Sequence, residues 1–181
     1  GDEMMHPFFR ELIPYAREMQ RKTGIPASVA LAQAALESGF GKSLLAKEGK
    51  NLFGIKAGHS WKGKKLTLPT IEYYQGKPVR VMAKWRKYDS YLDAFLDLAR
   101  VYYNGLYDDA LPYRRNPREF IRRAGKVYAT DPQYADKVIA LIERYNLDKY
   151  DLPPEQWVLD RSIVPETWYL AWAKACGKEV R

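Results

Sequence analysis

The chain has 181 residues, 46% of them hydrophobic, which is enough apolar material for one compact domain and too much for a disordered chain. Its formal net charge of +8 makes a polyanion an expected partner, whether nucleic acid, acidic lipid or anionic cell wall. There is one cysteine, and the two histidines, His6 and His59, lie far apart in the sequence. We therefore expect no internal disulfide, no metal site and no other cofactor.

Neither a membrane span nor a leader is predicted within this sequence. No run of 18 apolar residues occurs. Residues 1–9 lack the basic and apolar regions of a signal peptide.

Residues 7–24 have the apolar spacing of a helix. Gly24 is expected to end this helix as a C-cap, because glycine readily adopts the left-handed conformation. Pro14 lies inside the segment and lacks a backbone N–H. It predicts either a kink or a division into two short helices.

A second helix is expected to begin at Pro26 and to run to Ser38 or Gly39. It is rich in alanine, so that neighbouring elements can pack closely against it. One carboxylate, Glu37, stands in its last turn. A short basic helix should follow at about 43–47.

Residues 61–88 change to β-branched, aromatic and basic residues around a Gln75–Gly76 turn, which predicts a β-hairpin. An even-length loop centred on that turn pairs Glu72 with Val79 and places both on the face that carries Trp85. A carboxylate on the more apolar face indicates a functional role, although a register slip of one residue would remove this argument.

Helical signals return after the hairpin and continue to the end of the chain. The expected helices begin at Ser90, run from Asn116–Pro117 to about Lys126, from Asp131–Pro132 to about Tyr145, and from Pro165 to Gly177. The pair Pro153–Pro154 marks a linker. The predicted fold class is α+β, mostly α, with one β-hairpin.

The setting of Glu37 suits a glycosidase general acid. Alanines and Leu36 precede it, and Phe40 and glycines follow it. An apolar cleft disfavours the ionised carboxylate, so the acid is still protonated when a substrate arrives. The alternative is a solvated glutamate at a helix end.

Four stretches in one order carry a resemblance to a known family: ALESGFGKS (35–43), NLFGIK (51–56), TIEY (70–73) and KVYATDPQYADKV (126–138). Together they resemble the glycoside hydrolase family 73 glucosaminidase domain, found in bacterial peptidoglycan hydrolases that include flagellar rod-cap proteins and autolysins. The resemblance covers about residues 8–148. We therefore expect a catalytic domain at 1–150 and a C-terminal extension at 151–181, helical and packed on the domain through its tryptophans.

The resemblance implies a lysozyme-like helical core, a hairpin lobe and a substrate groove between them. It implies an exported endo-β-N-acetylglucosaminidase of the periplasm or cell wall, which cleaves the β-1,4 bond from N-acetylglucosamine to N-acetylmuramic acid. Glu37 matches the family's general acid, and Glu72 matches the hairpin glutamate proposed as a second catalytic carboxylate. Tyr128 and Tyr134 match the tyrosines of Y-A-T-D-P-x-Y, and Tyr128 is the better candidate for the groove.

The NLFGIK stretch supplies Asn51, Phe53 and Lys56 as candidate substrate-binding residues, together with Tyr134. Amide groups and aromatic faces suit an acetamido sugar, although Phe53 could equally be a core residue. Asp131 is expected to be an N-cap rather than a substrate contact.

Two other functions are also compatible with the sequence. A muramidase or lytic transglycosylase could use the same fold with one glutamate, although T-x-E-Y favours the glucosaminidase. A non-catalytic wall-binding or nucleic-acid-binding module is the alternative from another class, because aromatic residues of the basic hairpin could stack on bases. Carboxylates in a groove repel phosphate. We therefore expect the chain to bind peptidoglycan glycan strands and no nucleic acid. We also expect it to be a monomer.

Overall fold

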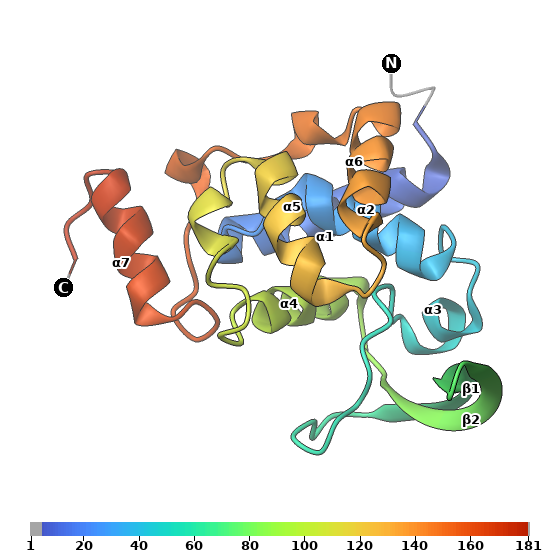
Figure 1. Ribbon diagram of the computed structural model, residues 1–181. Coiled ribbons are helices and arrows are strands. Elements are labelled where there is room, and N and C mark those ends of the chain that lie inside the picture. Colours follow the sequence, from blue (N-terminus) through green and yellow to red (C-terminus); the bar gives the residue numbers. More distant parts are fainter. Residues whose placement is uncertain (1–4, 181) are drawn as a thin grey trace.

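The computed structural model describes residues 5–180 and shows a helical body with a separate hairpin lobe (Figure 1). This confirms the predicted α+β class. The helices are α1 (Pro7–Thr23), α2 (Ala27–Ser38), α3 (Leu44–Gly49), α4 (Tyr91–Tyr102), α5 (Pro117–Tyr128), α6 (Tyr134–Tyr145) and α7 (Glu166–Ala175). The strands are β1 (Lys65–Tyr74) and β2 (Lys77–Arg86), and short 3-10 turns occur at Leu111–Tyr113, Leu147–Tyr150 and Pro154–Gln156. No helix within residues 5–180 is long and apolar enough to cross a bilayer.

Helix α2 lies at the centre of the helical body. Every residue from Ala27 to Ala35 is buried, and α1, α5 and α6 pack around the helix (Figure 1). Its alanines leave room for these neighbours to approach closely. The helix therefore needs no apolar stripe, because almost its whole surface faces protein.

Helix α1 is continuous through Pro14, so the predicted division into two short helices is wrong. A proline inside a helix costs about 3 kcal/mol, but Phe9, Leu12 and Met19 are buried along one face of α1. Their packing offsets the local loss. Gly24 ends the helix in the left-handed conformation (φ 77°), which confirms the predicted C-cap.

The N-terminus of α2 is capped from a distant part of the chain. Pro26 precedes the helix and offers no side-chain cap. Instead, Asp151 accepts hydrogen bonds from the Ser28 backbone N–H at 2.8 Å and from the Ser28 hydroxyl at 2.6 Å. The Gln20 side-chain oxygen accepts from the N–H groups of Ala27 and Leu152. Helix α2 is thus fixed at the end opposite Glu37.

The hairpin has the register expected from the sequence. Glu72 pairs with Val79 across the two strands, and Gln75 (φ 53°) and Gly76 (φ 77°) form the turn. Two consecutive positive φ angles match the right-handed twist of a tight hairpin. The lobe joins the body through α3 and through Arg86, whose guanidinium pairs with Asp97 at 2.9 Å.

Two boundaries after the hairpin differ from the prediction. Helix α5 continues past Lys126 to Tyr128, and α6 begins at Tyr134 instead of Asp131–Pro132. The Asp131 carboxylate accepts from the Gln133 N–H at 2.9 Å and so closes a turn before the helix starts. The expectation that Asp131 is the N-cap is therefore wrong.

The C-terminal segment packs through tryptophans. Trp157 and Trp172 are buried in a second apolar cluster, and Trp168 packs against both this cluster and the main core. Buried Arg114 donates to the Trp168 carbonyl at 3.3 Å and to the Tyr103 hydroxyl at 3.1 Å. These contacts join the segment to the body. The division into domains at residue 150 stays a prediction.

Candidate active site

Glu37 stands at the exposed end of the buried helix α2. The chain turns sharply after it, because Gly39, Phe40 and Gly41 all have positive φ angles of 58°, 58° and 80°. The Ser38 hydroxyl accepts from the Gly41 N–H at 2.8 Å and donates to the Ala34 carbonyl at 2.6 Å. This turn leads the chain away from Glu37 and leaves the carboxylate accessible.

The surroundings of Glu37 favour its protonated form. Removal from water by neighbouring protein atoms raises the pKa of its carboxyl, and hydrogen bonding with Tyr134 partly opposes this. Within residues 5–180, Glu37 forms no ion pair. Gly54 approaches closely, since a Cβ there would lie 3.6 Å from Glu37 Oε2. Glu37 is thus open to a ligand yet partly sheltered from water.

Tyr128 and Tyr134 are stacked beside Glu37. Their ring centroids are 5.5 Å apart with 23° between the planes. Burial raises the pKa of both hydroxyls, and the negative charge of Glu37 raises both further. Both tyrosines therefore remain protonated hydrogen-bond donors. Tyr128 donates to the Phe53 carbonyl at 3.3 Å.

Gln33 and Tyr102, which the sequence analysis did not select, hold Tyr134 in place. The Gln33 amide is fully buried and donates to the Tyr134 hydroxyl at 3.1 Å. Its oxygen accepts from the Tyr102 hydroxyl at 2.5 Å. The Tyr134 oxygen accepts this hydrogen bond from Gln33, so its own O–H is free to donate to Glu37. One feature of the sequence could have indicated Gln33: it is a polar residue one helical turn before Glu37 in an alanine-rich helix.

Glu72 forms an ion pair with Lys56. The Lys56 ammonium lies 2.9 Å from the Glu72 carboxylate, and the side chains are 55% and 37% exposed. The same ammonium lies 5.7 Å from the ring centre of Trp85. The Trp85 indole N–H is buried without a hydrogen-bond partner among the described residues, a donor that the sequence analysis did not identify. The structure thus places Lys56, Glu72 and Trp85 together.

Asn51 and Phe53 are placed differently from the expected sugar contacts. Asn51 is 1% exposed, and its side chain bonds the backbone of Phe53, Ile55 and Arg86. Phe53 is 2% exposed and packs edge-on against Phe95. Neither side chain is available to a ligand in this structure. Both instead fix the loop that presents Gly54 to Glu37 and the Phe53 carbonyl to Tyr128.

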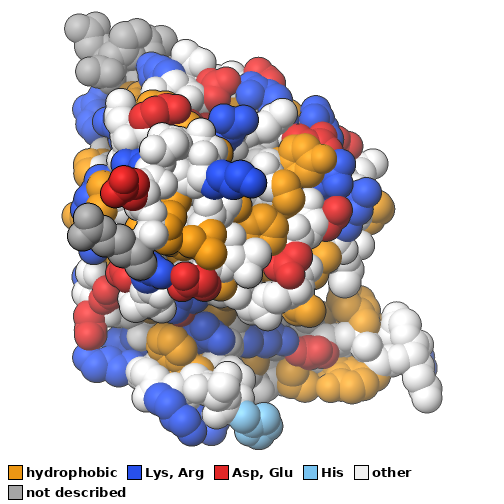
Figure 2. Space-filling view, turned by 90° about the vertical axis from the view of Figure 1, so that its left-hand side faces the viewer, with side chains coloured by type: hydrophobic (Ala, Val, Ile, Leu, Met, Phe, Trp, Pro, Cys, Tyr) orange, Lys and Arg blue, Asp and Glu red, His pale blue; other side chains and the backbone are white. Residues whose placement is uncertain are grey.

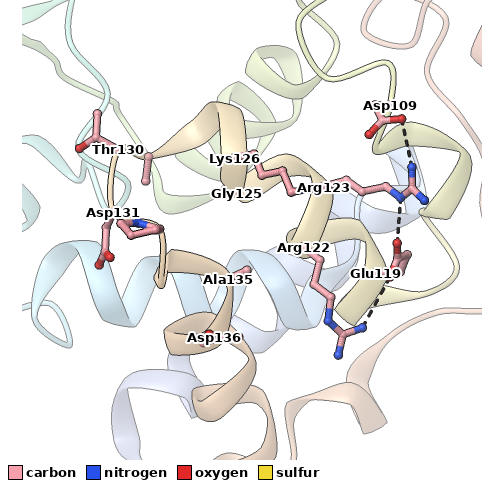
Figure 3. Close-up of a pocket in the computed structure, with 12 residues that line it drawn as sticks. Asp109, Glu119, Arg122, Arg123, Gly125, Lys126, Thr130, Asp131, Ala135 and Asp136 are labelled. Atoms are coloured by element: carbon pink, nitrogen blue, oxygen red, sulfur yellow. Dashed lines mark hydrogen bonds and ion pairs between the residues drawn. The ribbon is translucent and has the colours of Figure 1, made fainter.

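A separate hollow of about 670 Å³ lies over α5 and the start of α6 (Figure 3). Figure 3 shows Arg123 held between Asp109 and Glu119, at 3.0 and 2.8 Å. Its lining includes none of the residues grouped around Glu37. These ion pairs give the hollow a mixed charge. Among the residues described, no three His, Cys, Asp or Glu side chains form a potential metal site.

Comparisons with known proteins agree on one family. A family model described as "Glucosaminidase: Mannosyl-glycoprotein endo-beta-N-acetylglucosaminidase" matches residues 13–147. The chain is 42% identical over 154 residues to the peptidoglycan hydrolase FlgJ of Vibrio cholerae, a match covering 80% of this chain and 46% of that protein. It is 35% identical over 152 residues to the exo-glucosaminidase LytG of Bacillus subtilis, covering 80% and 52%. The chain spans about half the length of these curated relatives.

Solved structures show the same similarity. The catalytic domain of the autolysin Auto from Listeria monocytogenes matches with a TM-score of 0.71 at 35% identity, covering 80% of this chain and 85% of that one. A glycoside hydrolase domain of Salmonella typhimurium FlgJ matches with a TM-score of 0.63 at 35% identity, covering 77% and 95%. The resemblance drawn from the four sequence stretches is thereby confirmed.

Proposed function

This chain belongs to the glucosaminidase family of glycoside hydrolases, and on that premise we propose that it cleaves the β-1,4 bond from N-acetylglucosamine to N-acetylmuramic acid in peptidoglycan. The observation that carries the proposal is the state of Glu37: an accessible carboxyl at a helix end, with a raised pKa and no cationic partner among the described residues. These are the requirements for a general acid.

In this proposal, the Glu37 proton passes to the glycosidic oxygen as the bond to the anomeric carbon breaks. The carboxylate that remains accepts the hydrogen bond of Tyr134, which stabilises the new negative charge. Tyr128 stacks on Tyr134 and keeps its ring in position.

Glu72 is proposed to orient or activate the attacking water. It stands on the hairpin face that also carries Trp85, and its side chain forms an ion pair with Lys56. Lys56 and Tyr134 are proposed to line the substrate site. Asn51 and Phe53 are proposed to stabilise the loop that presents Gly54 to Glu37. Attack by the substrate's own acetamido group is the alternative that would make Glu72 dispensable.

The remaining proposals concern context. We propose that the protein acts in the periplasm or cell wall, on glycan strands and not on nucleic acid. We further propose that it is a monomer and that residues 151–181 are an extension of the catalytic domain. The relatives are named as peptidoglycan hydrolase, exo-glucosaminidase and autolysin, which supports a site of action in the wall.

Digestion of purified peptidoglycan tests the bond that is cleaved. A glucosaminidase leaves N-acetylglucosamine at the new reducing ends, a muramidase leaves N-acetylmuramic acid, and a lytic transglycosylase leaves an anhydro sugar. Borohydride reduction followed by chromatography identifies the terminal sugar. Reduced muramic acid or an anhydro product would overturn the proposal. Internal cleavage of long strands, rather than release of single end sugars, would support endo action.

A further inference from the structure

The excess positive charge of the chain is concentrated in the hairpin lobe. Residues 61–88 include eight Lys or Arg and one Glu, so this segment carries +7 of the chain's +8. The other residues together carry only +1. Figure 2 shows blue Lys and Arg side chains over the lower part of the molecule, where Figure 1 places the hairpin.

The two faces of the hairpin differ in their surroundings. The inner face carries Glu72 and Trp85, and Leu66 on this face reaches Gly49 of α3. The other face points away from the body, as the alternation of partly covered and exposed residues along β1 shows. We call it the outer face; its exposed apolar and basic side chains include Ile71, Tyr73, Arg80, Met82 and Lys84.

The outer face combines exposed apolar side chains with unpaired cations. Ile71 is 54% exposed, Tyr73 71% and Met82 64%. Within residues 5–180, Arg80 and Lys84 form no ion pair, and the outer face itself contains no carboxylate. Long apolar side chains rarely gather on an exposed surface unless something binds there. The combination fits an anionic ligand with aliphatic parts.

We propose that the outer face is a second, non-catalytic docking surface for the carboxylate-bearing peptide stems of peptidoglycan. This inference rests on the proposed function, which brings the enzyme to a surface that displays such stems in dense array. Arg80 and Lys84 bind stem carboxylates, and Ile71 and Met82 contact the short aliphatic side chains between them. The inner face meanwhile remains free for the strand that is being cleaved. Because the stems are repeated, many weak contacts combine to retain the enzyme on the wall.

Binding to insoluble wall tests the outer face without interference from lysis. We choose Glu37→Gln as the parent and add Arg80→Glu with Lys84→Glu. The matched control reverses Arg115 and Lys174, which are exposed and without an ion pair among the described residues. Both variants carry the same net charge. A milder pair, Arg80→Gln with Lys84→Gln, removes the same two charges and keeps the test valid if the charge reversals unfold the protein.

The measurement is the fraction of protein that pellets with purified peptidoglycan, stripped of attached polymers, at increasing NaCl. The outer-face reversal should weaken binding about tenfold at low salt, and the neutral pair about half as much on a logarithmic scale. The control pair should bind nearly as the parent does. Equal losses in the outer-face and control variants, or no loss in either, would overturn the proposal.

A second arm identifies the partner. Removal of the stems by an amidase should abolish the difference between the outer-face and control variants. A difference that persists on stem-free glycan contradicts the assignment to stems. Hydrolysis of a soluble stem-free oligosaccharide by the versions that retain Glu37 tests the proposed function separately. No cleavage by the wild type would overturn that function, whereas the pelleting result alone decides the docking surface.

Discussion

As the proposed general acid, Glu37 has to be both open to a bulky substrate and sheltered enough to stay protonated. The structure meets both demands by ending a buried helix at this residue and turning the chain away through Gly39, Phe40 and Gly41. The hydrogen bond with Tyr134 partly opposes the rise in the pKa of Glu37 that burial causes. The pKa of Glu37 is therefore set first by burial, which raises it, and second by one identifiable hydroxyl, which lowers it.

We expect Tyr134→Phe to move the alkaline limb of the pH profile of kcat/KM to higher pH. Activity that needs protonated Glu37 is lost as pH rises through its pKa. Removing the hydrogen bond that lowers this pKa should raise it further. Tyr128→Phe is the control, because the Tyr128 hydroxyl bonds the Phe53 carbonyl. An unchanged limb in Tyr134→Phe, or a shift to lower pH, would contradict this account.

Gln33→Leu should destabilise the protein and reduce kcat. The substitution keeps the approximate volume but leaves the buried hydroxyls of Tyr102 and Tyr134 without their shared partner. The expected loss is about 1–3 kcal/mol in the free energy of unfolding. Chemical denaturation and a pH profile measured together check it. A merely structural role would leave the alkaline limb of the profile in place.

At the scale of elements, the two ends of α2 have different structural roles. Its C-terminal end presents Glu37, and its N-terminal end is held by Asp151, which lies 123 residues beyond Ser28. Burial raises the pKa of Asp151 to about 6. The folded protein therefore binds a proton here more tightly than the unfolded chain does.

This linkage predicts how stability depends on pH. Between about pH 4 and pH 6 the folded state retains the Asp151 proton while the unfolded chain releases it. Stability contributed by this group therefore falls as pH rises through that window. Asp151→Asn keeps an acceptor for the Ser28 N–H and cannot ionise. The free energy of unfolding of the wild type relative to Asp151→Asn should thus decline from pH 4 to pH 7, and a rise would refute the assignment.

The hairpin carries the second proposed catalytic carboxylate. Glu72→Gln should retain less than about a tenth of wild-type activity if Glu72 activates water, since such catalysis contributes at least 10²-fold. Proton NMR of the first released anomer should then show inversion. Retention of configuration with near-normal activity of Glu72→Gln would instead favour attack by the acetamido group of the substrate.

The elements differ in how far the sequence could predict them. The hairpin register was predictable, because the Gln75–Gly76 turn and the alternation of residues both fix it. The continuity of α1 was not, since the local rule for Pro14 ignores the tertiary packing of that helix. In the site, Glu37 stood out by its position, whereas the partnership of Gln33 with Tyr102 joins residues 69 apart and requires the fold. The role of Asn51 could not be decided from the sequence, because the same amide chemistry suits a sugar or a loop backbone.

For the whole molecule, the uneven distribution of charge predicts a salt effect that depends on the substrate. Clearing of insoluble wall should slow as NaCl rises, because exposed charges are screened over about 8 Å at physiological ionic strength. Cleavage of a short neutral oligosaccharide should change little. Turbidity and chromatographic assays over the same salt series check this pair of expectations. Equal salt dependence of both reactions would show that the charge serves another purpose.

The most direct test of the central claim is the wall-lytic rate of Glu37→Gln. The amide has nearly the same shape as the carboxyl, but it cannot donate a proton to the leaving oxygen. The account predicts a loss of about 10²–10⁴-fold with unchanged thermal unfolding and unchanged pelleting with intact wall. Near wild-type lysis by a folded Glu37→Gln protein would contradict it.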